Sequence, residues 1–245
     1  MGMPMTYILR LLLPCLAACL FSLPGWANEF TPAQRAEIVQ ILRDALKQDP
    51  SILRDAVNAL QTDDGEHQKM ALAAAKDMLI DPADPVGGNP KGDVTIVEFF
   101  DTRCPYCRKL EPTMAELLAR DHGVRLVYKD LPILGPASVL GSKALLAAQK
   151  QGGYEKLRDA IMAAPPQTTK AMIQDAALRL GLDWKRLEHD MDDPAIQSRI
   201  NANLQLARSI GIEGTPALVI GGDLTPGAVD LPELRKTVAT ARGAK

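Results

Sequence analysis

Two cysteines separated by two residues are the side chains in this chain best suited to covalent chemistry. They are Cys104 and Cys107, with Pro105 and Tyr106 between them. A thiolate is a nucleophile, and a pair at this spacing can close into a disulfide and reopen by exchange with another disulfide. Zinc sites and structural disulfides use the same spacing, but zinc needs four ligands and the three histidines show no paired spacing. The pattern therefore favours redox chemistry.

The residues on either side of the pair predict a strand that turns into a helix. Residues 94–100 form a short apolar, β-branched and aromatic run, which is typical of a buried strand. After the cysteines, Leu110, Met114 and Leu117 recur at helical spacing. Cys104 is then at the helix N-terminus, where unpaired backbone N–H groups and the helix dipole favour thiolate over thiol. This predicts Cys104 as the attacking sulfur and Cys107 as the more buried, resolving sulfur.

Glu98 is the one charged residue within the predicted strand. It alternates with apolar neighbours, so its carboxyl group either points inward or lies at a solvated edge. An inward position would remove water from the carboxylate and raise its pKa. Glu98 is therefore a candidate for proton transfer near the cysteines.

Residues 1–27 predict a secretory signal peptide. Arg10 precedes an apolar run from Leu11 to Leu23, and Pro24-Gly25-Trp26-Ala27 supplies a small-residue ending. A second reading remains open, because Leu16-Ala17-Ala18-Cys19 resembles a bacterial lipobox and would make Cys19 a lipid anchor. Either route predicts export, and we expect a periplasmic protein.

Composition and cysteine count limit the classes of function. The net charge is −2 and no basic cluster occurs, so nothing indicates nucleic-acid binding. Of the 4 cysteines, Cys15 and Cys19 fall in the presequence, which leaves Cys104 and Cys107. Disulfides persist in an oxidising compartment, yet one pair this close closes almost no loop and adds little stability. Exchange is the better explanation of the pair.

Residues 28–80 are predicted to form a helical stalk. Thr31 and Gln34 make a capping box with Pro32 between them, Asp49-Pro50 separates a first helix from a second, and Asp63-Asp64-Gly65 separates the second from a third. Apolar stripes on such helices must be buried against something. The periodicity leaves open whether they pack on the same chain or on copies of it.

Residues 81–92 are dense in proline and glycine and predict a linker. Beyond it, residues 124–129 predict a second strand, parallel to the first, and residues 137–210 are helical throughout. A loop through Thr215-Pro216 then enters a strand, Gly221-Gly222-Asp223 forms a hairpin turn, and Asp230 opens a last helix. The predicted fold class is an α/β sandwich with a mixed central sheet.

This order of elements resembles the thioredoxin fold with the helical insertion of the DsbA family. The resemblance covers residues 84–242 and is carried by Glu98-Phe99-Phe100-Asp101 before CPYC and by the distant Gly214-Thr215-Pro216. It implies that residues 93–245 are the catalytic domain. It also implies that Pro216 is cis and lies against the active-site sulfurs, and that the Thr215 backbone meets the substrate.

The N-terminal part resembles the helical extension of the suppressor-of-copper-sensitivity C (ScsC) proteins, over the stretch FTPAQRAEIVQILRDALKQDPSILRDAVNALQ. That resemblance implies a homotrimer held together by residues 28–80. The chain departs from strongly oxidising DsbA proteins in two places. Tyr106 stands where they have histidine and adds no positive charge, and Thr215 is more like the isomerases of the superfamily.

Three hypotheses follow. In the first, the chain is a disulfide isomerase for misfolded or oxidised exported proteins, which implies a membrane thiol reductase as a partner that keeps Cys104 reduced. In the second, it is a monomeric dithiol oxidase. In the third, it binds copper through its two thiolates and acts in copper tolerance. No cofactor is expected beyond the redox-active pair, although the thiolates can bind copper incidentally.

Overall fold

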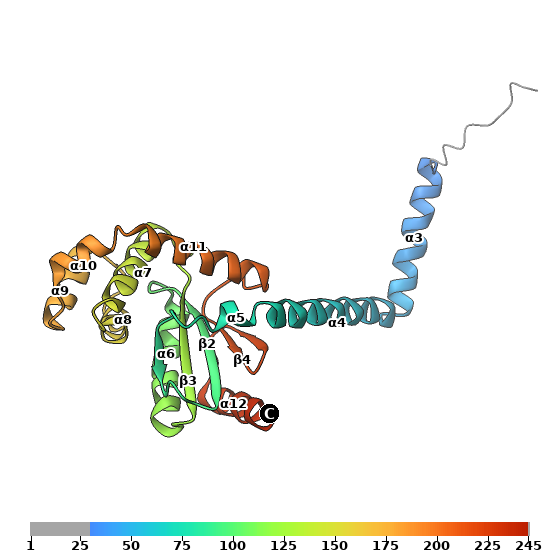
Figure 1. Ribbon diagram of the computed structural model, residues 1–245. Helices are drawn as coiled ribbons and strands as arrows, with labels where there is room; N and C mark the ends of the chain where they lie inside the picture. Colours follow the sequence, from blue (N-terminus) through green and yellow to red (C-terminus); the bar gives the residue numbers. More distant parts are fainter. Residues whose placement is uncertain (1–29, 245) are drawn as a thin grey trace, which may run out of the picture. The chain divides into compact units, whose positions relative to one another are not determined.

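The computed structural model describes residues 30–244, in two compact units, one through Leu60 and the other from Gln61 (Figure 1). The signal peptide predicted for residues 1–27, and the alternative lipid attachment at Cys19, lie outside the described residues. Among the helices of residues 30–244, none combines the length and the apolar character needed to cross a bilayer.

The first unit consists of helix α3 (Pro32–Gln48) and the start of α4 (Ser51–Ala74). The predicted capping box is present: the Thr31 hydroxyl accepts from the Gln34 backbone N–H, and the Gln34 side chain accepts from the Thr31 N–H at 2.9 Å. Asp49 accepts from the Ser51 N–H at 3.0 Å and so caps α4. Ten large apolar side chains of this unit are exposed in a single chain: Phe30, Ile38, Val39, Ile41, Leu42, Leu46, Ile52, Leu53, Val57 and Leu60.

The predicted break at Asp63-Asp64-Gly65 is wrong, because α4 continues through these residues. A glycine inside a helix costs only about 1 kcal/mol relative to alanine. Gly65 has an α-helical neighbour on each side and nothing within 4 Å of where a Cβ would lie. The helix ends instead near Ala75, and a short helix, α5 (Lys76–Leu79), follows.

The second unit is built on a five-stranded mixed sheet in the order β1-β3-β2-β4-β5. The strands are β1 (Val86–Gly88), β2 (Val94–Phe100), β3 (Val124–Asp130), β4 (Ala217–Ile220) and β5 (Asp223–Pro226). As predicted, β2 and β3 are parallel, while the other pairs are antiparallel. Gly221 and Gly222, with φ of 62° and 93°, form the predicted hairpin turn between β4 and β5.

Helices cover both faces of the sheet. On one face, α6 (Pro105–Arg120) and α12 (Leu231–Gly243) pack against Ile96 and Phe100 of β2. On the other face, Val97 and Phe99 of β2 pack against α5, the last turns of α4, and α11 (Pro194–Ser209). The predicted helical insertion follows β3 (Figure 1). It contains α7 (Pro136–Gln149), α8 (Tyr154–Ala163), α9 (Lys170–Arg179), α10 (Trp184–Asp190) and α11 (Pro194–Ser209).

Residues 81–92, predicted as a linker between 28–80 and 93–245, are part of the second unit in the structure. β1 lies within them and pairs with β3. The buried Asp84 forms ion pairs with Lys129 at 2.5 Å and with Arg199 at 2.9 Å. Proline and glycine here shape a short edge strand and the turn into β2. At Gly92 a Cβ would lie 2.6 Å from the Arg125 nitrogen, so only glycine fits that close approach.

Candidate active site

Cys104 is the N-cap of α6 and immediately precedes Pro105 at the first helical position. Proline is favoured there because the first N–H groups of a helix have no partner in the helix. The Cys104 N–H donates to the Asp101 carbonyl at 3.0 Å, which fixes the turn from β2 into the helix. The sulfur therefore sits at the positive end of the α6 dipole, as the sequence predicts.

The Cys104 thiol donates to the backbone carbonyl of Thr215, with 3.2 Å between sulfur and oxygen, across 111 residues of sequence. The Thr215–Pro216 peptide is cis, as the resemblance implies. Strand pairing brings the two segments together: Phe99 at the end of β2 faces Ala217 at the start of β4, so the loops beyond them meet at one sheet end. The structure thus unites four of the predicted site residues, Cys104, Cys107, Thr215 and Pro216.

The two cysteines differ in their surroundings. Both are free and buried, and Cys107 has no exposed surface while Cys104 retains 4%. Burial raises the pKa of the Cys107 thiol far above its ordinary value. Pro105 and Tyr106 between them are exposed, and the Tyr106 side chain is 62% exposed. The predicted roles of the two sulfurs are consistent with this asymmetry.

Asp101, directly after β2, organises the loops around Cys104. One carboxylate oxygen accepts from the Arg103 N–H at 2.8 Å. The other accepts from the Ile133 and Leu134 N–H groups at 2.9 and 3.0 Å. The loop after β3 is thereby held beside the CPYC turn, and it presents the half-exposed side chains of Ile133 and Leu134.

Arg108, the residue after Cys107, ties α6 to the helical insertion. Its guanidinium donates to the carbonyls of Thr102 at 2.6 Å, Met162 at 2.7 Å and Ala164. No sequence pattern indicates this contact, since an arginine on a helix is most often solvated. A cation held by three carbonyls fixes the distance between the start of α6 and the end of α8.

Glu98 points inward, as one of the two sequence readings predicted, and has no exposed surface. Its Oε2 accepts from Arg158 Nη2 at 3.1 Å, and its Oε1 has no hydrogen-bond partner within the described residues. Arg158 also binds Glu111 through both terminal nitrogens, at 2.6 and 2.7 Å. Burial raises the pKa of Glu98 to about 7, against the opposing effect of the Arg158 guanidinium.

The guanidinium of Arg158 is further enclosed by aromatic rings. Its central carbon lies 4.6 Å from the centre of the Phe100 ring and 4.4 Å from that of Tyr128. This cation faces the carboxylates of Glu98 and Glu111, and the exposed Asp159 lies 3.8 Å from its Nη1. A single proton on Glu98 leaves the Arg158–Glu111 pair neutral, which agrees with the direction of the pKa shift of Glu98.

Over residues 30–244 no three histidine, cysteine, aspartate or glutamate side chains converge as a metal site would require. The thiols of Cys104 and Cys107 are the soft donors at this end of the sheet.

Comparison with protein families gives two matches. Residues 95–239 match the DSBA-like thioredoxin domain, and residues 34–66 match the copper resistance protein ScsC N-terminal domain. The chain belongs to the DsbA-like thioredoxin family. This confirms the predicted fold and the resemblance of the N-terminal helices to ScsC.

Solved structures of DsbA-like proteins extend the likeness. A thioredoxin-like oxidoreductase from Silicibacter pomeroyi is 41% identical, with a TM-score of 0.67 over 69% of this chain and 98% of that one. Proteus mirabilis ScsC in a transitional conformation is 31% identical, with a TM-score of 0.66 over 88% of this chain and 98% of that one. Both likenesses extend over nearly the whole of the solved chains.

Among curated relatives, Na(+)/H(+) antiporter NhaA 3 of Salinispora tropica is 31% identical over 180 residues. The match includes 70% of this chain, but the chain spans only 28% of the antiporter's length. The region that matches this chain is thus one part of the longer antiporter.

Proposed function

We propose that this DsbA-like chain is a periplasmic thiol–disulfide isomerase that acts on exported proteins. The observation that carries the proposal is the position of the Cys104 sulfur, at the N-terminus of α6 and 3.2 Å from the carbonyl of the residue before a cis-proline. A substrate strand that pairs with the Thr215 backbone would bring its own disulfide to this sulfur. The apolar signal-peptide pattern supports the location.

In the proposed reaction, the Cys104 thiolate attacks one sulfur of a substrate disulfide. The substrate S–S bond breaks, a mixed disulfide forms, and the released substrate thiolate takes up a proton. A different substrate thiol then loses its proton, and its thiolate attacks the substrate sulfur of the mixed disulfide, which breaks the bond to Cys104 and regenerates the Cys104 thiolate. No net electrons are transferred, so a new substrate disulfide replaces the old one.

Cys107 resolves a mixed disulfide that no substrate thiolate has attacked. It must first lose its proton, and burial makes this unfavourable. We assign the acceptor role to Glu98, whose buried Oε1 has no hydrogen-bond partner within the described residues and whose raised pKa suits a proton held near neutral pH. The Cys107 thiolate then attacks the Cys104 sulfur. The substrate leaves reduced, and the enzyme retains the disulfide.

Isomerisation requires Cys104 to be reduced, which implies a membrane thiol reductase as the electron donor. Two features support isomerisation over oxidation: Tyr106 adds no positive charge to the thiolate, and threonine precedes the cis-proline. The exposed apolar side chains of α3, such as Ile41 and Leu42, favour a homotrimer, since such stripes seek partners. A trimer would present several reduced sites to one misfolded substrate.

Refolding of scrambled ribonuclease tests the isomerase. The reduced chain should restore ribonuclease activity, Cys104→Ala should abolish the gain, and Cys107→Ala should retain part of it, because Cys104 alone can exchange. Equal recovery by Cys104→Ala and the parent would refute the mechanism.

Sedimentation velocity separates the trimer from the monomeric oxidase. Leu42→Glu, which places a charge on the apolar face of α3, should give monomers with reduced isomerase activity, while the matched control Lys47→Glu should sediment like the parent. A parent that sediments as a monomer would favour the oxidase.

Copper tolerance, through the two thiolates, is a second candidate supported by the match of residues 34–66 to a copper resistance domain. It would require Cu(I) binding that is lost in Cys104→Ala.

A further inference from the structure

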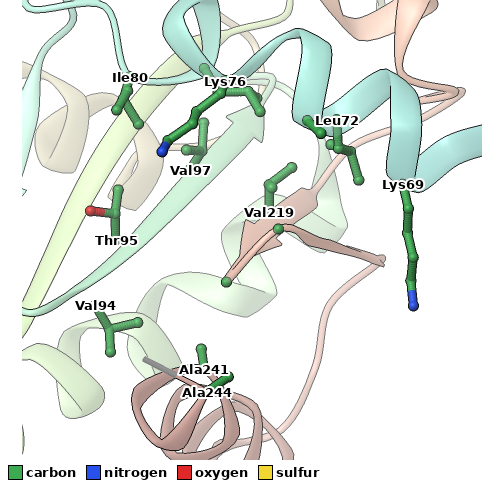
Figure 2. Close-up of a pocket in the computed structure, with 14 residues that line it drawn as sticks. Lys69, Leu72, Lys76, Ile80, Val94, Thr95, Val97, Val219, Ala241 and Ala244 are labelled. Atoms are coloured by element: carbon green, nitrogen blue, oxygen red, sulfur yellow. The ribbon is translucent and has the colours of Figure 1, made fainter.

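A cavity of about 530 Å³ lies at the end of the sheet where β2 begins, with the end of α4 and α5 from one face of the sheet and the end of α12 from the other along its walls. The end of α4, α5, β2, β4 and the end of α12 line it (Figure 2). Its volume lies within the range of about 300–1,000 Å³ typical of small-molecule pockets. The CPYC turn follows the other end of β2, so the pocket is separate from the site already described.

The lining is apolar apart from three side chains. Leu72, Ile80, Val97 and Val219 are among the residues that form the walls, and only Lys69, Lys76 and Thr95 contribute polar side-chain atoms. Apolar pockets with a few polar groups bind ligands whose polar end is fixed and whose body is buried.

The charge at the mouth of the pocket is positive. No lining residue is acidic. Lys69 has a partner, Asp223, at 3.9 Å, whereas Lys76 has no carboxylate within 4.0 Å in the part of the chain that the structure describes. Figure 2 shows the Lys76 side chain stretched over β2 from the start of α5, with Lys69 on the opposite side of the pocket. Among the described residues, one ammonium group beside the cavity therefore has no carboxylate partner.

We infer that this pocket binds a free long-chain carboxylate, with the alkyl chain against the accessible side chains of Ala73, Ile80 and Ala241 and the carboxylate beside Lys76. The Thr95 hydroxyl supplies a hydrogen-bond donor from the strand. The apolar walls accommodate an unbranched chain without unpaired polar groups, and the single uncompensated cation matches a single negative charge.

Isothermal titration of the whole chain with dodecanoate, kept below its micelle concentration, tests the inference. We expect saturable binding with one ligand per chain and a dissociation constant on the order of 10 µM. Lys76→Glu should weaken binding by about tenfold or more, because it replaces attraction by repulsion at the carboxylate. Dodecanol, which has the same chain without the charge, should bind more weakly than dodecanoate.

Two matched controls separate the pocket from general effects. Ala73→Trp should block binding, because Ala73 lines the pocket, whereas Ala74→Trp should leave it unchanged, because its neighbour Ala74 does not. Lys91→Glu reverses an exposed charge elsewhere and should not alter the affinity. Circular dichroism and thiol-exchange rates should match the parent in all four variants.

The inference is overturned if dodecanoate shows no saturable binding, if dodecanol binds equally well, or if Ala73→Trp and Lys76→Glu bind like the parent. Binding of a peptide with a C-terminal carboxylate but not of dodecanoate would also overturn it. So would a change in oligomeric state in Lys76→Glu, since the face would then be an interface between copies of this chain.

Discussion

Replacement of Arg158 by methionine should destabilise the second unit strongly, and more so at alkaline than at acidic pH. Methionine retains much of the apolar stem that packs beside Phe100 and Tyr128 but removes the charge. The Glu98 carboxylate then has no cation, and it has no exposed surface through which water could reach it.

The expected magnitude follows from the burial of the pair. Removing one partner of a buried ion pair costs about 3–5 kcal/mol, because the other charge is left unpaired in a medium that solvates it poorly. Loss of the contact between the guanidinium and two aromatic faces adds about 0.5–2 kcal/mol. We therefore expect Arg158→Met to lower the free energy of unfolding by about 3.5–7 kcal/mol at pH 8.

The pH dependence has a definite sign. Burial raises the pKa of Glu98 to about 7 from its ordinary value of 4.5, so the folded state binds this proton more tightly than the unfolded chain does. Stability from Glu98 is complete below pH 4.5 and is lost as the pH rises through about 7. Arg158 opposes the rise in pKa, so its removal raises the pKa of Glu98 further. The cost of Arg158→Met should therefore shrink at pH 5, by up to about 1.4 kcal/mol, because pH 8 lies one unit above the parent pKa of about 7.

Urea unfolding of parent and variant at pH 5 and pH 8, at equal chain concentration, measures both effects. In a Glu98→Gln background, which cannot ionise, the cost of Arg158→Met should depend less on pH. The remaining dependence comes from the buried Asp130, because burial raises its pKa to about 7 and Arg158 opposes that rise. Arg242→Met removes the exposed ion pairs with Asp93 and Asp121 and should have a smaller, pH-independent effect over this range. In the chain that retains Glu98, an Arg158→Met cost that is equal at pH 5 and pH 8, or larger at pH 5, would refute the proposed coupling between Arg158 and the proton on Glu98.

Three further predictions concern the CPYC helix. Arg108→Met removes three hydrogen bonds to backbone carbonyls and should lower the free energy of unfolding by about 1–2 kcal/mol, after allowance for partial exposure of the guanidinium. Amide hydrogen exchange over residues 162–166 should become faster. Unchanged exchange there would mean that Arg108 does not hold the end of α8 against α6. Tyr106→His should raise the reduction potential measured against glutathione, by about 30 mV if a histidinium stabilises the thiolate by 1.4 kcal/mol, whereas an unchanged potential would mean that the exposed position is electrically screened. In the reduced chain, iodoacetamide should modify Cys104 before Cys107 at pH 7, and Cys107 in Cys104→Ala should react only at strongly alkaline pH; reversed order would contradict the assigned roles.

The sequence predicted much of the site because its signals are local. The apolar strand before Cys104, the helical spacing after it and the proline at the first helical position all depend on neighbouring residues. The distant Thr215-Pro216 was found only by resemblance, since nothing local places it beside a sulfur 111 residues away.

The ion-pair partners of the buried carboxylates could not be predicted from the sequence. Arg158 meets Glu98 across 60 residues, and an arginine on a helix carries no sign of whether it is solvated or buried. The same limit explains the error at residues 81–92. Proline and glycine break regular structure in a linker and at an edge strand alike, and only the ion pairs of Asp84 with Lys129 and Arg199 distinguish the two.

The two borders of the sheet are both short: β1 has 3 residues and β5 has 4, the last of them Pro226. Unpaired strands at a border attract other extended chains, which is how sheets grow into aggregates. Under the proposed function the substrates are misfolded polypeptides, which could extend a sheet at such a border. Because the described borders expose little backbone for pairing, the proposed function would have a substrate strand pair at the cis-proline loop beside Cys104, where disulfide exchange releases it.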